Sequence, residues 1–343
     1  MNVLSLFDGM SCGQIVLERA GISVKKYFAS EIDKWAIRIT QKNYPDTIQL
    51  GDVINWQNWN LPKLDLLLGG SPCQGFSIAG KRLNWDDPRS LLFFRYVDCL
   101  RWYKPKRFVF ENVARMKKEV QDAISYELGV EPVRINSNLV SAQNRDRLYW
   151  TNIPNITQPK DKKIYLQDIL EYGHVDKMKS YCIDANYFKG GNLKRCFERA
   201  SRQLVFDKPV RIAHFGKGNQ GQRVYSLKGK SVTLSGEGGG WGAKIGLYPF
   251  TYSKKRGFGK FLGKAHSLQA SDYKSGSKLN RNQDQTSIVD IENLVYRKLT
   301  PVECERLQTV PDNYTEEVSN SQRYKMLGNG WTVDVVAHIL SFA

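Results

Sequence analysis

Short apolar runs alternate with amphipathic segments over the first 150 residues. Apolar runs typical of buried strands occupy residues 3–7, 25–31, 65–70 and 107–113. Between them, apolar positions recur at the 3.6-residue spacing of helices in residues 13–21, 34–44 and 89–105. Two more extended runs follow at residues 131–138 and 147–153. This alternation predicts an α/β fold with a doubly wound, mostly parallel sheet.

The pattern changes at about residue 154. From there to residue 296 the chain is rich in glycine, serine, lysine and asparagine, and turns separate short strand-like pieces. Regular structure resumes with TPVECERLQ and ends on the apolar-periodic TVDVVAHILSF. We therefore expect a first domain at 1–153, a smaller, glycine-rich, mostly β or irregular domain at 154–296, and a C-terminal segment at 297–343 that returns to the first domain.

The net charge of +17 is distributed unevenly along the 343 residues. Between residues 151 and 300 there are 27 Lys and Arg against 12 Asp and Glu, which gives +15. This concentration favours a polyanionic partner, and a solvated basic surface is the alternative. An anionic membrane would favour a basic amphipathic helix, and no apolar run is long enough to span a bilayer. Because the start of the chain is too quickly acidic for a signal peptide, we expect a cytoplasmic protein with no membrane partner.

Cys73 is the cysteine whose neighbours indicate chemistry. The six cysteines are scattered, with no CxxC pair and only four histidines, so neither a disulfide scaffold nor a metal site is expected. Cys73 lies in GGSPCQGFS, where Gly69, Gly70 and Gly75 together with Pro72 predict a sharp turn at the end of an apolar strand. Such a turn presents the thiol at the carboxyl edge of the sheet, where open α/β folds bind ligands. The alternative is a buried cysteine that packs as a small hydrophobe.

Glu111 ends a strand in the same way, in the stretch FENV. The ends of parallel strands share one edge of the sheet, so Glu111 and Cys73 can converge. A thiol and a carboxyl side by side suggest nucleophilic attack and proton transfer. The stretch QNRDR adds Arg145 and Arg147, which point the same way if the chain is extended. The alternatives are an acid at a helix start and ordinary surface arginines.

A nucleoside site is predicted beside this edge. In FDGMSCG, Gly9 and Gly13 let a turn and the following helix approach a ligand closely. Glu31, about 20 residues on, is placed to accept hydrogen bonds from ribose hydroxyls. Asp52 could accept from an exocyclic amine, or could be a plain turn or N-cap acid. Because GxxxxGK[ST] and GxGxxG are both missing, a nucleoside without a bound pyrophosphate is favoured over NAD or ATP.

Together these segments resemble the DNA (cytosine-5)-methyltransferases. FDGMSCG, ASEID, GDV, GGSPCQGFSIAGKR, FENV, QNRDR, TPVECERLQ and MLGNGWTVDVV look like that family's motifs, in its order, over most of residues 1–150 and 297–343. The resemblance implies the S-adenosylmethionine-dependent methyltransferase fold, with S-adenosyl-L-methionine as cofactor and S-adenosyl-L-homocysteine as product. The implied activity is methyl transfer to C5 of a flipped-out cytosine in a specific duplex DNA sequence.

The same matching implies a role for each site residue. Cys73 would attack C6 of the cytosine, Glu111 would protonate N3, and Arg147 would contact O2. Arg145 would support that pocket and the nearby phosphate. The residues implied to contact the cofactor are Phe7, Gly9, Glu31, Asp52, Pro72 and Asn329.

The glycine-rich region would be the target-recognition domain. GNQGQRVYS resembles a recognition loop of small bacterial members, in which Gln220 would fill the gap left by the flipped base and Arg223 would read a guanine. Thr233 fits the same pattern. The stretch FSIAGKRLNWDDPRS, with Ser77 and Lys81, is expected to be a mobile loop that closes over DNA.

Two positions depart from the family's usual pattern. FDGMSCG replaces the more usual FxGxGG turn, and Trp331 stands in GNGWTV where a small residue is common. Both are similar to the animal de novo branch. They leave the detailed cofactor contacts open.

Two other functions remain open: a tRNA-methylating branch of the same family and a catalytically silent DNA-binding relative. The large basic recognition region speaks against the first, and the intact set of Cys73, Glu111 and Arg147 against the second. We expect a monomeric bacterial or phage enzyme whose partner is double-stranded DNA and which a cognate restriction endonuclease could accompany.

Overall fold

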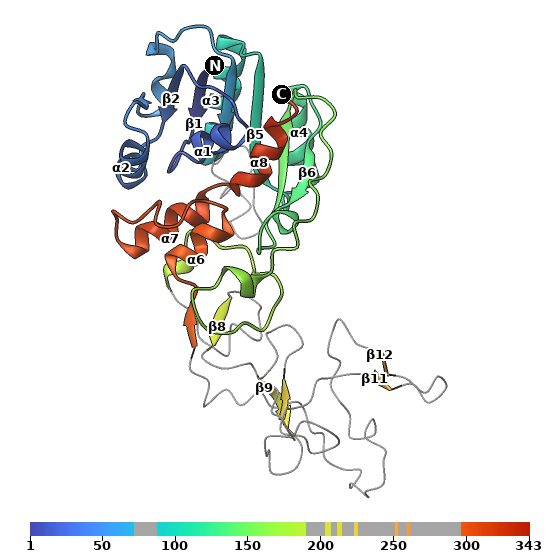
Figure 1. Cartoon of the computed structure of the whole chain (residues 1–343). Helices are drawn as coiled ribbons and strands as arrows, with labels where there is room; N and C mark the ends of the chain where they lie inside the picture. Colours follow the sequence, from blue (N-terminus) through green and yellow to red (C-terminus); the bar gives the residue numbers. More distant parts are fainter. Residues whose placement is uncertain are drawn as a thin grey trace, which may run out of the picture. The chain divides into compact units, whose positions relative to one another are not determined.

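The computed structural model describes residues 1–71, 88–189, 203–206 and 296–343, and the backbone of four short strands between 211 and 260. The chain divides into two compact units (Figure 1). Unit 1 comprises 1–165, 179–190 and 300–343, and unit 2 comprises 166–178 and 191–299.

Unit 1 is built on a seven-stranded sheet in the order β3-β2-β1-β4-β5-β7-β6. The pairs from β3 to β5 are parallel, whereas β7 runs antiparallel to both β5 and β6. This arrangement confirms the predicted mostly parallel sheet. The strand bounds are β1 Asn2–Leu6, β2 Lys26–Ser30, β3 Ile48–Gln49, β4 Leu66–Gly69, β5 Arg107–Val113, β6 Val133–Asn136 and β7 Asp146–Thr151.

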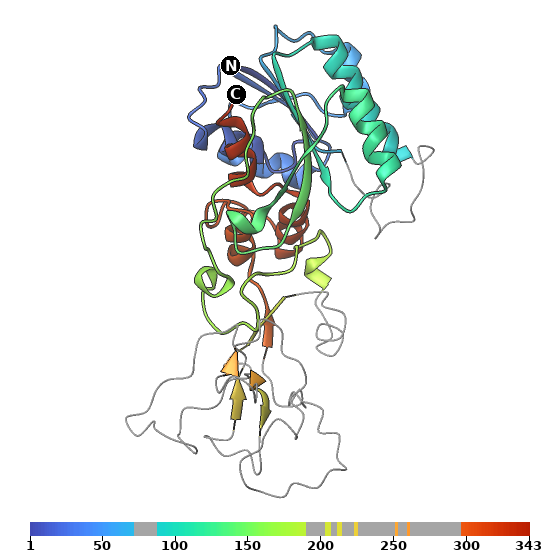
Figure 2. The same cartoon turned by 90° about the vertical axis from the view of Figure 1, so that its right-hand side faces the viewer.

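Helices cover both faces of this sheet. Figure 2 shows α3 on one face and α1 and α8 on the other. An ion pair between Arg19 of α1 and Asp334 of α8 joins the C-terminal segment to the first βα unit. The helix bounds are α1 Cys12–Arg19, α2 Lys34–Asn43, α3 Pro88–Tyr103, α4 Lys118–Leu128, α6 Pro301–Leu307, α7 Asn320–Asn329 and α8 Val333–Leu340.

The central strands β1 and β4 are mostly apolar because helices bury them from both sides. Phe110 of β5 packs against Tyr96 of α3 and against Trp150 of β7, with ring centroids 4.8 and 5.9 Å apart. Gly69 ends β4 under the same tyrosine, where a Cβ would come within 2.9 Å of the ring. The core thus fixes where β4 and β5 end, and with them the edge that carries the predicted chemistry.

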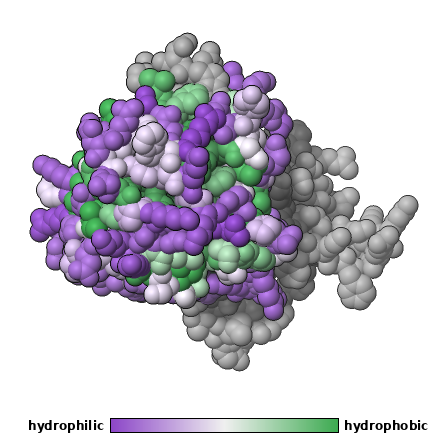
Figure 3. All heavy atoms as spheres, turned by 90° about the horizontal axis from the view of Figure 1, so that it is seen from above, coloured by the Kyte–Doolittle hydropathy of each residue, from purple (hydrophilic) through white to green (hydrophobic). Residues whose placement is uncertain are grey.

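Two helices were not predicted from the apolar pattern, namely α4 and α7. Elsewhere in unit 1, the predicted strands at 3–7, 25–31, 65–70 and 107–113 and the predicted helices at 13–21, 34–44 and 89–105 are confirmed to within a few residues. Among the described residues, no helix combines the length and apolar content needed to cross a membrane. From above, hydrophobic areas of the surface are interrupted by hydrophilic residues (Figure 3).

The strands described in unit 2 form short antiparallel pairs, and a 3-10 helix lies at Leu166–Ile169. The pairs are β8 Leu204–Phe206 with β13 Tyr296–Lys298, β9 Arg211–His214 with β10 Arg223–Tyr225, and β11 Thr251–Tyr252 with β12 Gly259–Lys260. Strands of two to four residues agree with the mostly β or irregular fold predicted for this region.

Candidate active site

The carboxyl ends of β4 and β5 lie side by side and carry the predicted chemistry. Gly69, the last residue of β4, is the register partner of Phe110, so the chain that follows β4 runs beside the last residues of β5, 111–113. The side-chain amide of Asn112, which is buried, donates to the backbone oxygen of Ser71 at 3.4 Å. The chain is thereby anchored to β5 immediately before Pro72 and Cys73, which both lie outside the described residues.

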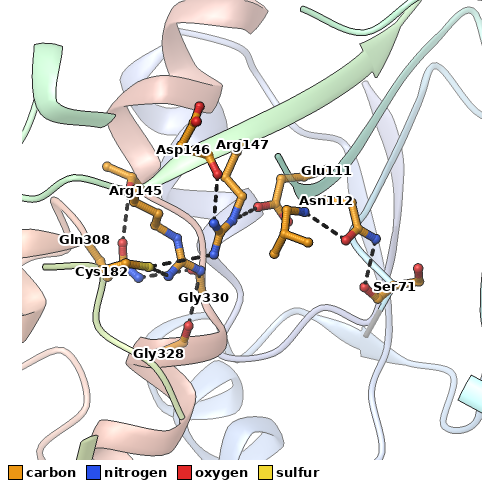
Figure 4. Close-up of polar contacts among 12 residues, drawn as sticks. Ser71, Glu111, Asn112, Arg145, Asp146, Arg147, Cys182, Gln308, Gly328 and Gly330 are labelled. Carbon is orange, nitrogen blue, oxygen red and sulfur yellow. Dashed lines mark hydrogen bonds and ion pairs between the residues drawn. The ribbon is translucent and has the colours of Figure 1, made fainter. Parts of the chain in front are cut away.

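Glu111 and Arg147 form an ion pair at this edge (Figure 4). In the antiparallel pair of β5 and β7, Glu111 faces Tyr149 and Val113 faces Arg147, which makes Glu111 and Arg147 diagonal neighbours on one face of the sheet. Arg147 Nε lies 2.7 Å from Glu111 Oε1, and the two side chains are 14% and 12% exposed. The pair is therefore nearly buried but reachable by a ligand that enters the edge.

Gly70 leaves space for this carboxylate. A Cβ at Gly70 would lie 3.1 Å from Glu111 Oε2 and 3.2 Å from Trp331 Nε1. The indole of Trp331, the residue that departs from the family pattern, therefore lies at the same edge as Glu111. Any larger residue at position 70 would push against both groups.

Arg145 lies behind the ion pair and is 4% exposed. Its Nη2 donates to the carbonyls of Gly328 and Gly330, at 3.1 and 2.8 Å, and its Nη1 donates to the carbonyl of Ile183 at 3.2 Å. The guanidinium thus supports the site from inside the protein. Its contact with a DNA phosphate stays a prediction.

Cys182 joins the two arginines and was missed by the sequence analysis. Its sulfur accepts from Arg145 Nη1 at 3.3 Å and lies 4.0 Å from Arg147 Nη2 (Figure 4). Both arginines therefore reach toward one point, as their alternate spacing predicts. Cys182 falls within the stretch 179–190, which belongs to unit 1 although it was assigned to the glycine-rich domain. No local pattern marks it, because its partners lie more than 30 positions away in the sequence.

The turn between β1 and α1 has an unusual backbone. Phe7, Gly9 and Ser11 all have left-handed φ values, of 57°, 60° and 62°. The amide of Gly9 donates to Glu31 Oε2 at 2.8 Å, which ties this turn to the end of β2. Nothing lies within 4 Å of a Cβ built on Gly9, so the turn borders open space. Gly13 differs from expectation: its missing side chain makes room for the Tyr27 hydroxyl, which a Cβ would approach to within 2.4 Å.

The other residues predicted to hold the cofactor lie on neighbouring loops. Glu31 is held rigidly, since its Oε1 also accepts from the amides of Ile32 and Asp33, both at 2.8 Å. Asp52 caps the short 3-10 helix Val53–Asn58 by accepting from the Ile54 amide at 3.0 Å, so the N-cap reading of this residue is confirmed. Asn329 is the last residue of α7 and is exposed. These contacts leave the predicted ligand roles as predictions.

Comparison with known proteins gives the family. The family model of the C-5 cytosine-specific DNA methylases matches residues 1–342. The chain belongs to this family. Orphan methyltransferase M.SPRI of Bacillus phage SPR is 29% identical to this chain, with 99% of this chain and 96% of the relative covered. Type II methyltransferase M.HhaI of Haemophilus parahaemolyticus is 27% identical, with 99% and 93% covered.

Solved structures share the fold of this C5 methylase. The Entamoeba histolytica methyltransferase EhMeth superposes with a TM-score of 0.58 at 16% identity, and covers 100% of this chain and 97% of its own. Spodoptera frugiperda DNMT2 gives 0.56 at 17% identity, with 99% and 98% covered. At these identities the likeness shows the fold alone, which is that of the S-adenosylmethionine-dependent methyltransferases.

For several predicted site residues of the methylase, the structure does not describe the side chain. For Arg223, at the start of β10, the backbone is described and the side chain is not. The predicted residues outside the described part are Pro72, Cys73, Ser77, Lys81, Gln220 and Thr233.

Asp8 is a buried acid in the turn between β1 and α1. Its Oδ1 accepts from the Tyr27 hydroxyl at 2.7 Å, and its Oδ2 has no hydrogen-bond partner. Removal from water raises the pKa of Asp8 to about 6, against the lowering effect of hydrogen bonds from Ser5, Tyr27 and Ser11. The charged form therefore costs stability that the protonated form does not.

The first testable prediction is that Asp8→Asn changes how stability depends on pH. The folded wild type holds a proton on Asp8 up to about pH 6, whereas the unfolded chain holds it only up to about pH 4. The free energy of unfolding of the wild type therefore falls by about 3 kcal/mol between these pH values. The free energy of unfolding of Asp8→Asn relative to wild type should therefore rise by that amount from pH 4 to pH 7, as measured by denaturant titration. Asp46→Asn, at an exposed acid, is the control and should show no such change. A pH-independent difference for Asp8→Asn would contradict the account.

Proposed function

We propose that this protein transfers a methyl group from S-adenosylmethionine to C5 of a cytosine that is flipped out of a specific duplex DNA sequence. The observation that carries the proposal is the Glu111–Arg147 pair, 2.7 Å apart, beside the anchored chain that leads from Ser71 to Cys73. Family membership over the whole chain supports the reaction class. A base inside a duplex cannot be reached from above its ring, so extrusion precedes the chemistry, at a cost of a few kcal/mol.

The first chemical step forms a bond between Cys73 and the base. The thiolate of Cys73 attacks C6, and the electron pair of the C5–C6 double bond becomes available at C5. Glu111 donates a proton to N3, which prevents a full negative charge on the ring. Arg147 donates a hydrogen bond to O2 and holds the ring in the plane that the attack requires.

The second step completes the substitution at C5. S-adenosylmethionine, when bound, supplies a methyl group on a sulfonium that a nucleophilic carbon can accept. A base then removes the C5 proton, the bond between sulfur and C6 breaks to release the Cys73 thiolate, and the N3 proton returns to Glu111, which restores the aromatic ring. The account thus uses Cys73 twice, as nucleophile and as leaving group.

The turn between β1 and α1 and the loops beside it fit S-adenosylmethionine. Open space above Gly9 and a rigid carboxylate at Glu31 suit a nucleoside with free ribose hydroxyls. Asp52 keeps an oxygen for the exocyclic amine, because its cap uses Oδ1. We assign the cofactor site to these residues together with Phe7, Pro72 and Asn329.

Duplex DNA is the favoured substrate over tRNA. M.SPRI and M.HhaI, which match over 99% of this chain, are named an orphan and a type II methyltransferase, and the family model that matches residues 1–342 is that of DNA methylases. DNMT2 proteins match at 17% identity or less, which concerns the fold and not the substrate. We assign target recognition to unit 2, which covers the predicted range 154–296 apart from residues 154–165 and 179–190, which belong to unit 1. Gln220, Arg223 and Thr233 would lie at the bases, and Ser77 and Lys81 on the loop that closes over DNA.

The direct test of this function is to sequence methylated DNA. Cells that express the chain should carry 5-methylcytosine at one short recurrent sequence in their genomic DNA, resolved base by base. Unmodified DNA together with newly methylated tRNA would favour the RNA-directed alternative. Binding to duplex DNA without any methylation would favour the silent relative.

A second prediction concerns the charge of residues 151–300. Each phosphate contact adds about 0.9 to the steepness with which log K falls against log salt. With +15 in this region, we expect a slope steeper than about −4 for duplex DNA, measured by titration between about 50 and 200 mM salt. A nearly flat dependence would mean that the positive charge serves another purpose.

A further inference from the structure

Gln308 is a buried amide at the end of α6 that none of the assigned roles uses. It is 0% exposed. Its Nε2 donates to the carbonyls of Leu327 and Gly330, at 2.6 and 3.1 Å. Its Oε1 accepts from Gln143 Nε2 at 3.0 Å and from Thr332 Oγ1 at 2.9 Å. All four hydrogen-bonding positions of the amide are therefore used, which fixes both its position and its orientation.

Gln308 and Arg145 hold the same turn, residues 327–330. The carbonyl of Gly330 accepts from both, at 3.1 Å from Gln308 and 2.8 Å from Arg145 (Figure 4). Arg145 also holds the carbonyl of Gly328 at 3.1 Å. These three hydrogen bonds, to Gly328 and Gly330, flank the exposed Asn329, the last residue of α7.

The turn has little room to move on its buried side. A Cβ at Gly328 would come within 2.2 Å of the backbone carbon of Asp184. One at Gly330 would lie 3.1 Å from Met10 Cε and 3.3 Å from Cys12 Sγ. Because packing and hydrogen bonds both act on the turn, its position depends on Gln308 staying in place.

We propose that Gln308 is a positioning residue that sets the turn at 327–330, and through it the position of Asn329 in the cofactor site. The inference rests on the proposed function, which assigns Asn329 to that site. Loss of the amide leaves two buried carbonyls with fewer donors, so the turn can shift away from the β1–α1 turn that it packs against. Asn329 then contributes less to binding, although it is itself unchanged.

Two substitutions remove different numbers of the hydrogen bonds that the Gln308 amide makes. Gln308→Met keeps the length of the side chain and removes every hydrogen bond. Thr332→Val is nearly isosteric and removes a single bond to Gln308 Oε1, so it keeps the test usable if Gln308→Met does not fold. Ser125→Ala is the matched control. It removes a buried hydrogen bond, from Trp150 Nε1 to Ser125 Oγ at 2.9 Å, but Ser125 lies in α4 and does not contact residues 327–330 through this bond.

The test combines a binding cycle with hydrogen exchange. Calorimetry with S-adenosylmethionine should show that Asn329→Ala and Gln308→Met each weaken binding by about 10-fold. The double variant should bind no more weakly than the weaker-binding of the two single variants. Thr332→Val should weaken binding less, in the same direction, and Ser125→Ala should leave it unchanged. Amide exchange at residues 327–330 should be faster in Gln308→Met and in Thr332→Val than in Ser125→Ala.

Additive effects of Gln308→Met and Asn329→Ala would overturn the inference, as would unchanged exchange at residues 327–330. If Gln308→Met does not fold, the same two outcomes apply to Thr332→Val. If wild type binds S-adenosylmethionine but methylates no DNA, the proposed function is refuted. The double-mutant binding cycle of Gln308 and Asn329 still decides the role of Gln308 in that case. If wild type does not bind S-adenosylmethionine, Asn329 has no such site to be positioned in, and the inference fails with it.

Discussion

Replacing Cys73 by alanine should reduce methylation of duplex DNA by roughly 10⁴-fold or more, because C5 of cytosine does not react without a nucleophile at C6. Alanine removes one sulfur and changes little volume. Binding of S-adenosylmethionine and of duplex DNA should therefore persist. The measurement is the rate of incorporation of labelled methyl groups into DNA that contains the recognised sequence.

The control for this variant is another thiol of the same enzyme. Cys99 lies in α3, is fully buried in the core and has no assigned role in the site. We expect Cys99→Ala to lower stability and to leave the turnover of the folded enzyme largely intact. Equal losses of turnover in Cys73→Ala and Cys99→Ala would show that thiol loss acts through folding and not through chemistry.

Replacing Glu111 by glutamine should lower turnover by roughly 10²-fold or more, the usual scale of general acid catalysis. Glutamine keeps the shape of the side chain and its carbonyl can still accept from Arg147 Nε, which the carboxylate does at 2.7 Å. It cannot donate a proton to N3. The loss should therefore fall on kcat and not on the binding of DNA or cofactor.

Glu303→Gln offers a matched comparison for Glu111→Gln. Glu303 is a buried glutamate whose carboxylate accepts from the Thr300 amide at 2.8 Å in the capping box of α6. This substitution should cost stability and leave kcat close to wild type. Near-normal turnover in Glu111→Gln would dismiss Glu111 as the acid.

The sequence predicts the sheet of unit 1 well because its central strands are buried on both faces. Such strands appear as apolar runs, which β4 shows over its whole length and β1 and β5 show in their stretches VLSL and FVF. The shared edge of β4 and β5 also follows from the sequence, since parallel strands end together. The antiparallel strand β7 brings Arg147 to Glu111, and this contact depends on pairing across the sheet that no local pattern records.

The helix α7 was missed because its buried side includes a charge. Arg323 is nearly buried, and its guanidinium lies 2.9 Å from the carboxylate of Glu305, which is fully buried. A hydrophobic pattern counts Arg323 as a surface position, so α7 has no continuous apolar stripe. The contacts of Cys182 and Gln308 could not be predicted for a related reason, since their partners are far away in the sequence. In addition, the sequence does not distinguish a polar side chain inside a core from one at the surface.

The covalent bond between Cys73 and C6 of cytosine is the central claim, and 5-fluorocytosine tests it most directly. A target cytosine with fluorine at C5 can accept the methyl group but has no C5 proton to lose, so the enzyme stays joined to its DNA. Duplex DNA with 5-fluorocytosine at the recognised position is incubated with S-adenosylmethionine and the product is examined under denaturing conditions. The account predicts a denaturant-resistant protein–DNA species for wild type, none for Cys73→Ala, and none with RNA of equal sequence. A crosslink that persists in Cys73→Ala, or a wild type that methylates ordinary DNA and is never trapped, would contradict it.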